Sequence, residues 1–502
     1  MDLKQYRDKV RGCWLGKNIG GTLGAPLECK RGVFDVEYYL HDYTKGVLPN
    51  DDLDLQLVFL NAAENYGKNL NSEILGEYWL SYIIANWSEY GAGRNNMALG
   101  LLPPLSGSVH NHNKDSCGCF IRSEIWACLA PGHPEIAVKY AYEDAIVDHE
   151  GEGVYAEIFC AAVQSAAFAE ADLDTLIKIG LSYIPENSDV AKAVNTAVEC
   201  KKEGVDWKKA RKKVLQAVPG AFGMNQGYED REPEPDVPVG PLGYDAPSNI
   251  GLMMVGWVYG EGDFSKSICI AAGCGEDADC TAGTLGAILG IIGGAESLPS
   301  KWLEPIGDEI KTLTVDMTDW TIRIPEKVSD LTNRVLRLMP VFMGGYCDIM
   351  CEEGINIIMN SGKALFSQSY AKGVLKKQSF LDEMCFTGVK RENTLFGVVV
   401  DYVNGINIKE GEEKKIVLHF ENHLNKQQWL EIKWYVPLEW QVLQGKKSMF
   451  CLDQRHGGTS LGEKEFIIIP SEIKECKYDL ILEIKSNGRL STMLIPVTFT
   501  VE

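Results

Sequence analysis

The sequence has no apolar run long enough to cross a bilayer. Its longest apolar segment, residues 281–295 (TAGTLGAILGIIGGA), is rich in glycine and is shorter than the ~20 apolar residues of a membrane-spanning helix. The N-terminal segment MDLKQYRDKVRGCWLG is polar and charged, whereas a secretory signal peptide has an apolar centre. We therefore expect a cytoplasmic protein that does not associate with a membrane.

Basic residues are few relative to acidic ones. The chain has 49 Lys and Arg against 70 Asp and Glu, which gives a net charge of −21. Proteins that bind nucleic acids or anionic lipids do so largely through Lys and Arg. We expect neither kind of partner.

Paired metal-binding cysteines are also lacking. The 15 cysteines form no repeated CxxC pairs, and the single CxC, Cys117 and Cys119, has no second pair downstream. A zinc ribbon needs two such pairs. The pattern is typical of reduced thiols in a cytoplasm.

Apolar periodicity divides the chain into regions. Up to about residue 340, apolar residues recur at helical spacings of three and four, most clearly in 53–66, 73–85, 134–147, 154–169, 189–200 and 282–292. From about 391, apolar and polar residues alternate, as in TLFGVVVDYV and KKIVLHFEN, which is typical of an antiparallel sandwich. We predict a multidomain protein with an all-α domain over 1–340, a connector over 341–390, and an all-β accessory sandwich over 391–502.

A further loop is predicted within the helical region. Residues 228–249 (YEDREPEPDVPVGPLGYDAPSN) are rich in proline and acidic residues. Loops of this length inside a compact domain are usually functional or disordered.

Glycines recur every four residues in two segments. Gly12, Gly16, Gly20 and Gly24 would share one helical face, and 283–290 carries glycines with a similar spacing. Each glycine costs a helix about 1 kcal/mol relative to alanine. The simplest interpretation is close packing of two helices; the alternative is close approach of a ligand.

Two pairs of carboxylates stand directly before predicted helices. Asp51 and Asp52 precede one helix, and Asp277 and Asp279 precede another. Acidic residues at helix starts are common, because each interacts favourably with the helix dipole by about 0.3–1 kcal/mol. Both pairs are, however, embedded in apolar and small residues. If the segments meet, four carboxylates would repel unless a hard cation such as Mg²⁺, Mn²⁺ or Ca²⁺ neutralised them.

Four segments in this order resemble the ADP-ribosylglycohydrolase family. They are 11–28 (ending GGTLGAPLE), 50–60 (starting NDDLD), 117–122 (containing GCFIR) and 273–290 (containing DADCTAG). Residues 148–159 (DHEGEGVYAEIF) look like a segment of one large bacterial subgroup. The resemblance implies that the helical domain is an orthogonal bundle around a binuclear Mg²⁺ site. The alternating pattern over 391–502 predicts a separate, Ig-like sandwich without catalytic residues.

The resemblance also implies a set of metal ligands. The matching positions are Asn50, Asp51, Asp52, Asp277, Asp279 and Cys280. Asn50 replaces a hydroxyl residue but keeps an oxygen donor. Cys280 replaces Thr or Ser, and a thiol is a poor ligand for Mg²⁺. One metal position is therefore expected to be weakened, lost or changed to Ca²⁺, so the cofactor is one or two Mg²⁺ ions, with Mn²⁺ or Ca²⁺ as alternatives.

Candidates for catalytic residues come from the same resemblance. Glu28 matches a glutamate that gates or activates the substrate in some relatives, although a solvated turn residue is the simpler interpretation. Asp51, Asp52 or Glu28 would serve as general base or position the attacking water.

Candidates for substrate contact follow further along the chain. The backbone at Gly118 and Cys119 would cradle a phosphate or another polar group. Arg122 would pair with an anion, or structurally with Asp115 or Glu124. His149 would lie at the rim of the site or make a structural hydrogen bond. Asn249 would contact substrate or only cap a helix.

These observations predict a metal-dependent glycohydrolase that cleaves an N- or O-glycosidic bond of ADP-ribose or a related ribosyl compound. Its partner would be a small molecule or an ADP-ribosylated substrate, which Trp87, Tyr90 or Tyr228 would stack against. One alternative is a hydrolase of a small sugar or furanoside, because the predicted sandwich resembles accessory modules of carbohydrate-active enzymes. Another is a non-catalytic binder, which the four retained aspartates argue against.

Overall fold

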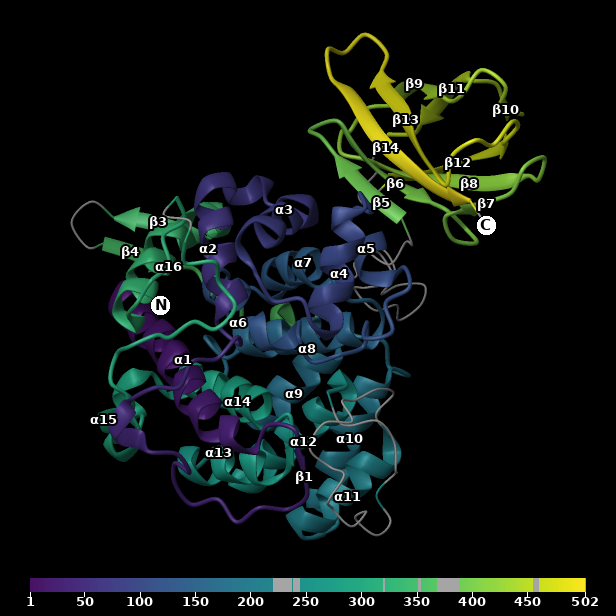
Figure 1. Cartoon of the computed structure of the whole chain (residues 1–502). Helices are drawn as coiled ribbons and strands as arrows, with labels where there is room; N and C mark the ends of the chain where they lie inside the picture. Colours follow the sequence, from purple (N-terminus) through teal and green to yellow (C-terminus); the bar gives the residue numbers. More distant parts are fainter. Residues whose placement is uncertain are drawn as a thin grey trace. The chain divides into compact units, whose positions relative to one another are not determined.

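The computed structural model describes residues 1–219, 237, 244–318, 321–350, 354–367, 388–454 and 460–501. The described residues divide into two compact units, one within Met1–Gln368 and the other within Asp382–Glu502. Figure 1 shows helices in the first unit and strands in the second. The predicted fold class, a helical bundle followed by a β-sandwich, is confirmed.

The first unit contains sixteen α-helices among its described residues. They are α1 (Leu3–Gly24), α2 (Asp54–Tyr66), α3 (Ser72–Tyr82), α4 (Ser88–Ala98), α5 (Leu105–Ser108), α6 (Glu124–Leu129), α7 (Pro134–Ala145), α8 (Glu152–Ala166), α9 (Leu173–Leu181), α10 (Asp189–Lys202), α11 (Trp207–Ala217), α12 (Ala246–Gly260), α13 (Phe264–Gly273), α14 (Ala278–Gly293), α15 (Ser300–Ile306) and α16 (Val328–Met343). Among the described residues, no helix combines the length and apolar character that a bilayer-spanning segment requires.

Several helices begin at residues that favour a helix start. Pro134 is the first residue of α7, where its fixed backbone angle suits the first turn. The side chains of Asp172 and Ser188 accept hydrogen bonds from the first-turn N–H groups of α9 and α10. These caps satisfy donors that the helix itself leaves free.

Helices α1 and α14 pack backbone against backbone through their glycines. A Cβ atom added at Gly16 would lie 2.0 Å from the carbonyl oxygen of Gly286, and one at Gly20 would lie 2.0 Å from that of Ala282. The glycine spacing therefore reflects close helix packing, as its simplest interpretation predicted. In α14, the residues from Ala278 to Ile291 are all buried, so this helix is central to the unit.

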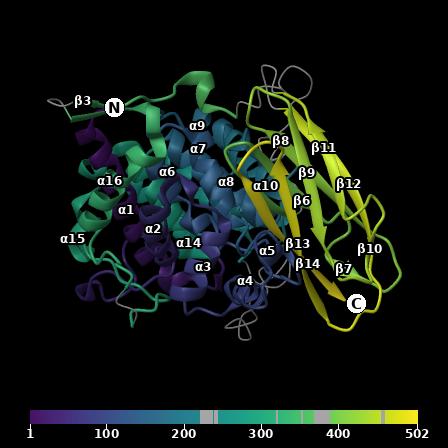
Figure 2. The same cartoon turned by 90° about the horizontal axis from the view of Figure 1, so that it is seen from above.

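The second unit is a sandwich of two five-stranded sheets, with strand orders β10-β12-β8-β6-β5 and β11-β9-β13-β14-β7 (Figure 2). Its strands are β5 (Gly388–Glu392), β6 (Phe396–Asp401), β7 (Asn407–Ile408), β8 (Lys414–Asn422), β9 (Gln428–Tyr435), β10 (Gln441–Val442), β11 (Lys447–Leu452), β12 (Ser460–Ile469), β13 (Lys477–Ser486) and β14 (Thr492–Val501). Alternate residues of β8 and β9, including Phe420 and Trp434, are buried in its core. The period of two in the sequence produces this pattern.

The unit boundaries differ from those expected from the sequence. Helix α16 continues to Met343, past the expected boundary at 340. It is followed by a hairpin of β3 (Cys347–Met350) and β4 (Gly354–Ile357), and Ile357 accepts a hydrogen bond from the N-terminal amine. Residues 341–367 therefore belong to the helical unit, whereas residues 368–387 of the expected connector lie outside the described residues. The first strand of the sandwich begins at Gly388.

A second short sheet in the helical unit joins β1 (Lys30–Arg31) to β2 (Gly275–Glu276). These strands immediately follow the first glycine-rich segment and precede the last acidic pair. Most of the loop predicted over 228–249 lies outside the described residues. Its end is described, and there Asp245 caps α12.

Replacement of Gly16 by alanine tests the contact between α1 and α14. The added methyl group forces the two backbones apart, and overpacking of this kind generally costs about 1–3 kcal/mol. The better helix propensity of alanine offsets about 1 kcal/mol of this. We expect Gly16→Ala to lower the free energy of unfolding measured with urea. Gly345→Ala is the control, because its Cβ meets no atom within 4 Å; equal stability of the two variants would contradict the contact.

Candidate metal centre and pocket

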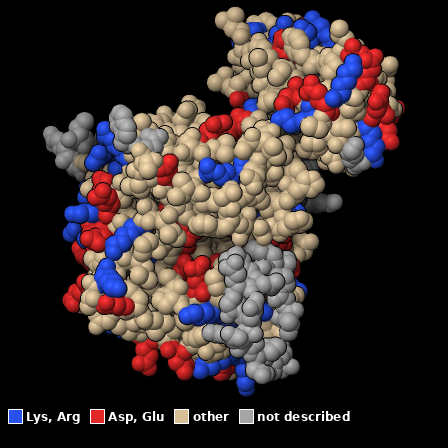
Figure 3. All heavy atoms as spheres, in the orientation of Figure 1, with Lys and Arg blue, Asp and Glu red and all other residues tan. Residues whose placement is uncertain are grey.

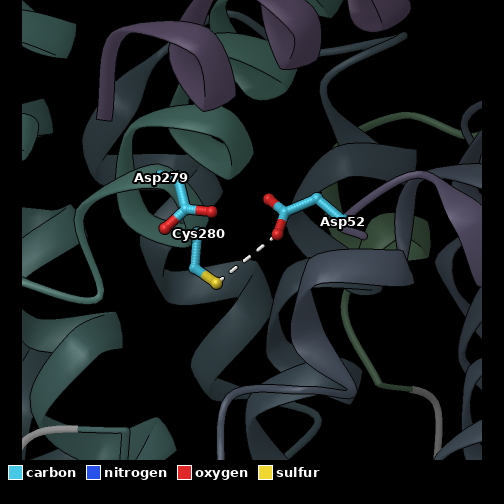
Figure 4. Close-up of side chains that lie close together, drawn as sticks. All are labelled: Asp52, Asp279 and Cys280. Atoms are coloured by element: carbon cyan, nitrogen blue, oxygen red, sulfur yellow. Dashed lines mark hydrogen bonds between the residues drawn. The ribbon is translucent and has the colours of Figure 1, made fainter. Parts of the chain in front are cut away.

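The two acidic segments meet where α2 and α14 begin. Figure 4 shows Asp52 facing Asp279 and Cys280, whose ligand atoms all lie within 4.8 Å of one another. Glu28, Asp277 and Asp279 form a second group, in which one carboxylate oxygen of each residue lies within 4.8 Å of the others. Because Asp279 belongs to both groups, the two form one continuous acidic cluster.

Two asparagines hold the loops that carry these acids. The side-chain amide of Asn50 donates a hydrogen bond to Asp279 Oδ2 at 3.1 Å, and its carbonyl oxygen accepts one from the backbone N–H of Asp52 at 2.7 Å. Asn50 therefore bridges the two segments through its NH₂ group. On the other side, Asn249 Oδ1 accepts a hydrogen bond from the N–H of Asp277 at 3.2 Å.

Burial and mutual repulsion raise the pKa values of three carboxyl groups of the cluster, those of Glu28, Asp277 and Asp279. Burial, followed by the charge of Asp52, raises the pKa of Asp279 to about 6. The charge of Asp279, followed by burial, raises the pKa of Glu28 to about 9, although Glu28 is an exposed residue. Burial and the charge of Asp279 also raise the pKa of Asp277 well above its usual range. Full ionisation of the cluster would thus create more negative charge than the surrounding protein neutralises, so the carboxyl groups tend to keep their protons.

The donor set fits a hard divalent cation. Asp279 is 4% exposed, and its Oδ1 atom has no hydrogen-bond partner in the described part of the chain. A buried carboxylate oxygen in that state needs a cation or a proton, and carboxylate oxygens suit Mg²⁺, Mn²⁺ and Ca²⁺. Cys280 fits less well, because burial raises the pKa of its thiol well above the usual value and the thiolate is the ligand form.

A small pocket with a cavity volume of about 80 Å³ opens beside the cluster. Its wall includes acids of both pairs together with aromatic and small residues. The lining residues are Glu28, Asp51, Trp87, Ser88, Glu89, Tyr90, Cys117, Gly118, Ile121, Tyr244, Asp277, Asp279 and Cys280. The predicted stacking residues Trp87 and Tyr90 are therefore at the pocket, whereas Tyr228 lies outside the described residues.

The loop with the sequence GCFIR reaches the pocket only at its start. Gly118 lines the wall, where an added Cβ would lie 2.2 Å from Glu89 Oε1. Cys119 is buried, and its thiol donates to the carbonyl oxygen of Gly153 at 2.8 Å. Of these two predicted contacts, Gly118 alone lies where a substrate can touch it.

The predicted role of Arg122 in binding an anion is wrong. Its side chain is fully buried and pairs with Asp144 at 2.7 Å and Asp148 at 2.6 Å. It also donates to the carbonyl oxygen of Gly118 at 2.8 Å. Neither Asp115 nor Glu124, the two structural partners suggested by the sequence, is the ion-pair partner. Arg122 instead supports the pocket wall from behind.

His149 and Asn249 also lie beneath the pocket instead of in it. His149 is fully buried, with Nε2 2.8 Å from Ser116 Oγ and Nδ1 2.8 Å from Asp148 Oδ1. Asn249 is fully buried in the first turn of α12 and is not its cap, because Asp245 takes that role. The polar atoms of both side chains contact polar groups within the protein, and both side chains are buried. Neither is therefore exposed to a substrate in the pocket.

The residues that the sequence did not indicate are Lys17, Glu89 and Tyr244. Lys17 Nζ lies 3.1 Å from Asp52 Oδ2, while Glu89 and Tyr244 line the pocket. Lys17 had one visible signal, a single charge within the apolar, glycine-rich run GCWLGKNIGG. Glu89 and Tyr244 stand in segments with no comparable pattern.

Comparison with known proteins identifies the helical region. Residues 2–335 match the sequence model of the family described as ADP-ribosylglycohydrolase. Among solved structures, an "ADP-ribosylglycohydrolase-related protein complex" is 18% identical with a TM-score of 0.44, over 68% of this chain and 100% of that chain. An alkylpurine DNA glycosylase AlkC of Pseudomonas fluorescens bound to DNA is 11% identical with a TM-score of 0.14, over 89% of this chain and 99% of that chain.

Neither structural similarity is strong enough to carry an argument, and the comparison with curated proteins finds no match. The family match alone extends over more than half of the chain and includes all four of the motifs that carried the resemblance. The chain therefore belongs to the ADP-ribosylglycohydrolase family.

Proposed function

We propose that this protein is a metal-dependent glycohydrolase that cleaves an N- or O-glycosidic bond of ADP-ribose or a related ribosyl compound. Family membership indicates a glycohydrolase in general. The observation that carries the proposal further is the unpartnered Asp279 Oδ1 within a cluster of buried carboxylates beside a pocket. Burying several carboxylates together destabilises the folded state, and such clusters are typical of functional sites.

Asp277 and Asp279 would hold the cation, with Asp51, Asp52 and Glu28 close to it. When bound, a divalent ion at such a site orients sugar hydroxyl groups and lowers the pKa of a water ligand. A nearby positive charge also favours the ionised form of Glu28. Glu28 lies in the pocket wall, where it would accept the proton of the attacking water.

Trp87 and Tyr90 supply the apolar side of the pocket. Trp87 is 47% exposed and lies with its ring centre 6.2 Å from that of the buried Tyr90. Stacking on an aromatic face suits both an adenine ring and the apolar face of a sugar. These two residues support either substrate class.

A second candidate substrate is a small neutral sugar or furanoside, and the charge of the pocket favours it. The lining residues that the structure describes include five carboxylates and no Lys or Arg. Arg122, the expected partner of a diphosphate, is buried and already paired. The net charge of −21 also disfavours long-range attraction of an anion.

Nucleic acid is not proposed as a partner. Figure 3 shows acidic and basic side chains interspersed on the face drawn. A protein that binds nucleic acid gathers Lys and Arg into a patch or stripe. Both the composition and this distribution support a small-molecule or ADP-ribosylated substrate.

Incubation with Mg²⁺ and either an ADP-ribosylated protein or a panel of aryl pentosides separates the two substrate classes. Release of free ADP-ribose without pentoside turnover would eliminate the sugar. Pentoside turnover without release of ADP-ribose would eliminate the ADP-ribosyl substrate. If neither substrate turned over while the protein bound Mg²⁺, the non-catalytic alternative would replace the proposal.

Asp279→Asn should abolish catalysis and weaken Mg²⁺ binding together, because Asp279 belongs to both ligand groups. Loss of a single hydrogen-bond partner of a metal ligand commonly reduces metal affinity or activity by about 10–100-fold, and we expect a larger loss here. Binding is measured by calorimetry and activity by product release. Asp174→Asn is the matched control, since Asp174 is an exposed acid in the first turn of α9. If Asp279→Asn bound Mg²⁺ as tightly as the wild type, Asp279 would not be a metal ligand.

The metal-free protein should lose stability as pH rises through about 6. The pKa of Asp279 is raised to about 6 in the folded chain, above the ~3.9 of an unfolded aspartate. The folded state therefore binds the proton more tightly, and its advantage is present at low pH and lost as Asp279 ionises. Thermal melts in chelator at pH 5.5 and pH 8 should show the higher Tm at pH 5.5. Excess Mg²⁺ should reduce the difference; an identical difference with and without Mg²⁺ would argue against metal at Asp279.

A further inference from the structure

Lys17 is a buried cation directly behind the acidic cluster. It lies in α1, and its side chain is 1% exposed. Its Nζ atom is 3.1 Å from Asp52 Oδ2, 3.3 Å from Glu124 Oε1 and 3.3 Å from Thr284 Oγ1. Lysine is almost never fully buried unless it is paired, so this position carries a fixed positive charge.

Glu124, one of the two carboxylates that contact Lys17, is itself fixed by hydrogen bonds. Glu124 Oε2 accepts a hydrogen bond from Gln56 Nε2 at 2.9 Å, and Glu124 Oε1 accepts one from Gln164 Nε2 at 3.3 Å. The same Gln56 accepts a hydrogen bond from the backbone N–H of Ile125 at 2.9 Å. Glu124 is thus held by neighbours on two helices, and it holds Lys17 beside Asp52.

The two ligand groups of the cluster differ in how much of their charge is already neutralised. In the first group, Asp52 Oδ2 faces Lys17, and Asp52 Oδ1 lies 3.5 Å from the thiol of Cys280. That group therefore has one carboxylate, Asp279, that is not engaged by a protein cation or a thiol. The second group consists of three carboxylates, Glu28, Asp277 and Asp279. The described residues that line the pocket beside it include no Lys or Arg.

We propose that the ammonium group of Lys17 supplies the positive charge at the first group, so that the centre binds one divalent cation per chain, at the second group. The inference rests on the metal centre of the proposed function. Lys17 is a positioning residue in this arrangement: it fixes Asp52 and repels a second cation. The expected number of ions thus follows from the position of one lysine of this chain, beside Asp52.

Metal stoichiometry tests the proposal without reference to activity. The full-length protein is freed of metal by chelation and titrated with Mn²⁺, with bound ions counted by calorimetry and free ions by electron paramagnetic resonance. We expect one Mn²⁺ per wild-type chain. Lys17→Met keeps the length of the side chain and removes its charge. It should bind a second Mn²⁺ or bind the first at least about tenfold more tightly, because a cation behind the site no longer opposes binding.

Lys9→Met is the matched control. Lys9 lies on the same helix and donates to the carbonyl oxygens of Ile291 and Ile292 at 2.8 and 3.1 Å, in the last turn of α14. It therefore helps to join the same helix to its neighbour, but through neutral partners. Lys9→Met should leave the number of bound Mn²⁺ ions and their affinity unchanged.

Two Mn²⁺ ions in the wild-type chain would overturn the inference while leaving the metal centre intact. Unchanged stoichiometry and affinity in Lys17→Met would overturn it as well. Absence of any bound Mn²⁺ in the wild type would contradict both the inference and the metal dependence under "Proposed function". If Lys17→Met does not fold, the wild-type count decides, and Lys17→Arg, which keeps the charge, should still bind a single ion.

Discussion

The backbone contact between α1 and α14 is the constraint on which the site depends. Glycines at Gly16 and Gly20 let the carbonyl oxygens of α14 approach to a distance that any side chain would prevent. Glu28 follows the end of α1, and Asp277 and Asp279 stand at the start of α14. The same contact that fixes the helices therefore fixes the spacing of the carboxylates. Widening it by the size of one methyl group would move the two walls of the cluster apart.

Behind the cluster, two buried cations each contact two buried carboxylates. Lys17 contacts Asp52 and Glu124, and Arg122 contacts Asp144 and Asp148. Each pair is shielded from water, so breaking one by removing a single partner leaves an uncompensated charge and is strongly destabilising. The front of the site, by contrast, carries acids without protein cations, such as Asp277 and Asp279. The paired charges around Lys17 and Arg122 stabilise the fold, whereas Asp277 and Asp279 line the pocket and are accessible to a ligand.

The sequence was sufficient for the features that depend on local pattern. Helical and alternating periodicities predicted both units, and the glycine spacing together with Asp51–Asp52 and Asp277–Asp279 indicated two segments able to meet. It was insufficient wherever the outcome depended on which side chain already had a partner. Arg122 was expected at the substrate because nothing in its own segment reveals Asp144 and Asp148, which come from elsewhere in the fold. For the same reason the sequence left two roles open for His149, of which the structural hydrogen bond is the one found, and it did not reveal that Asn249 is buried behind Asp277.

The Lys17–Thr284 hydrogen bond joins residues 267 positions apart, so the cluster exists only after distant parts of the chain have come together. Closing so long a loop is entropically unfavourable, and contacts of this kind form late and slow the folding of a domain. A cation held by Asp277 and Asp279, as proposed, would bind the folded chain and not the unfolded one, and would add stability that grows with its free concentration. The availability of metal would then set how long each chain survives against proteolysis, in addition to whether it is active.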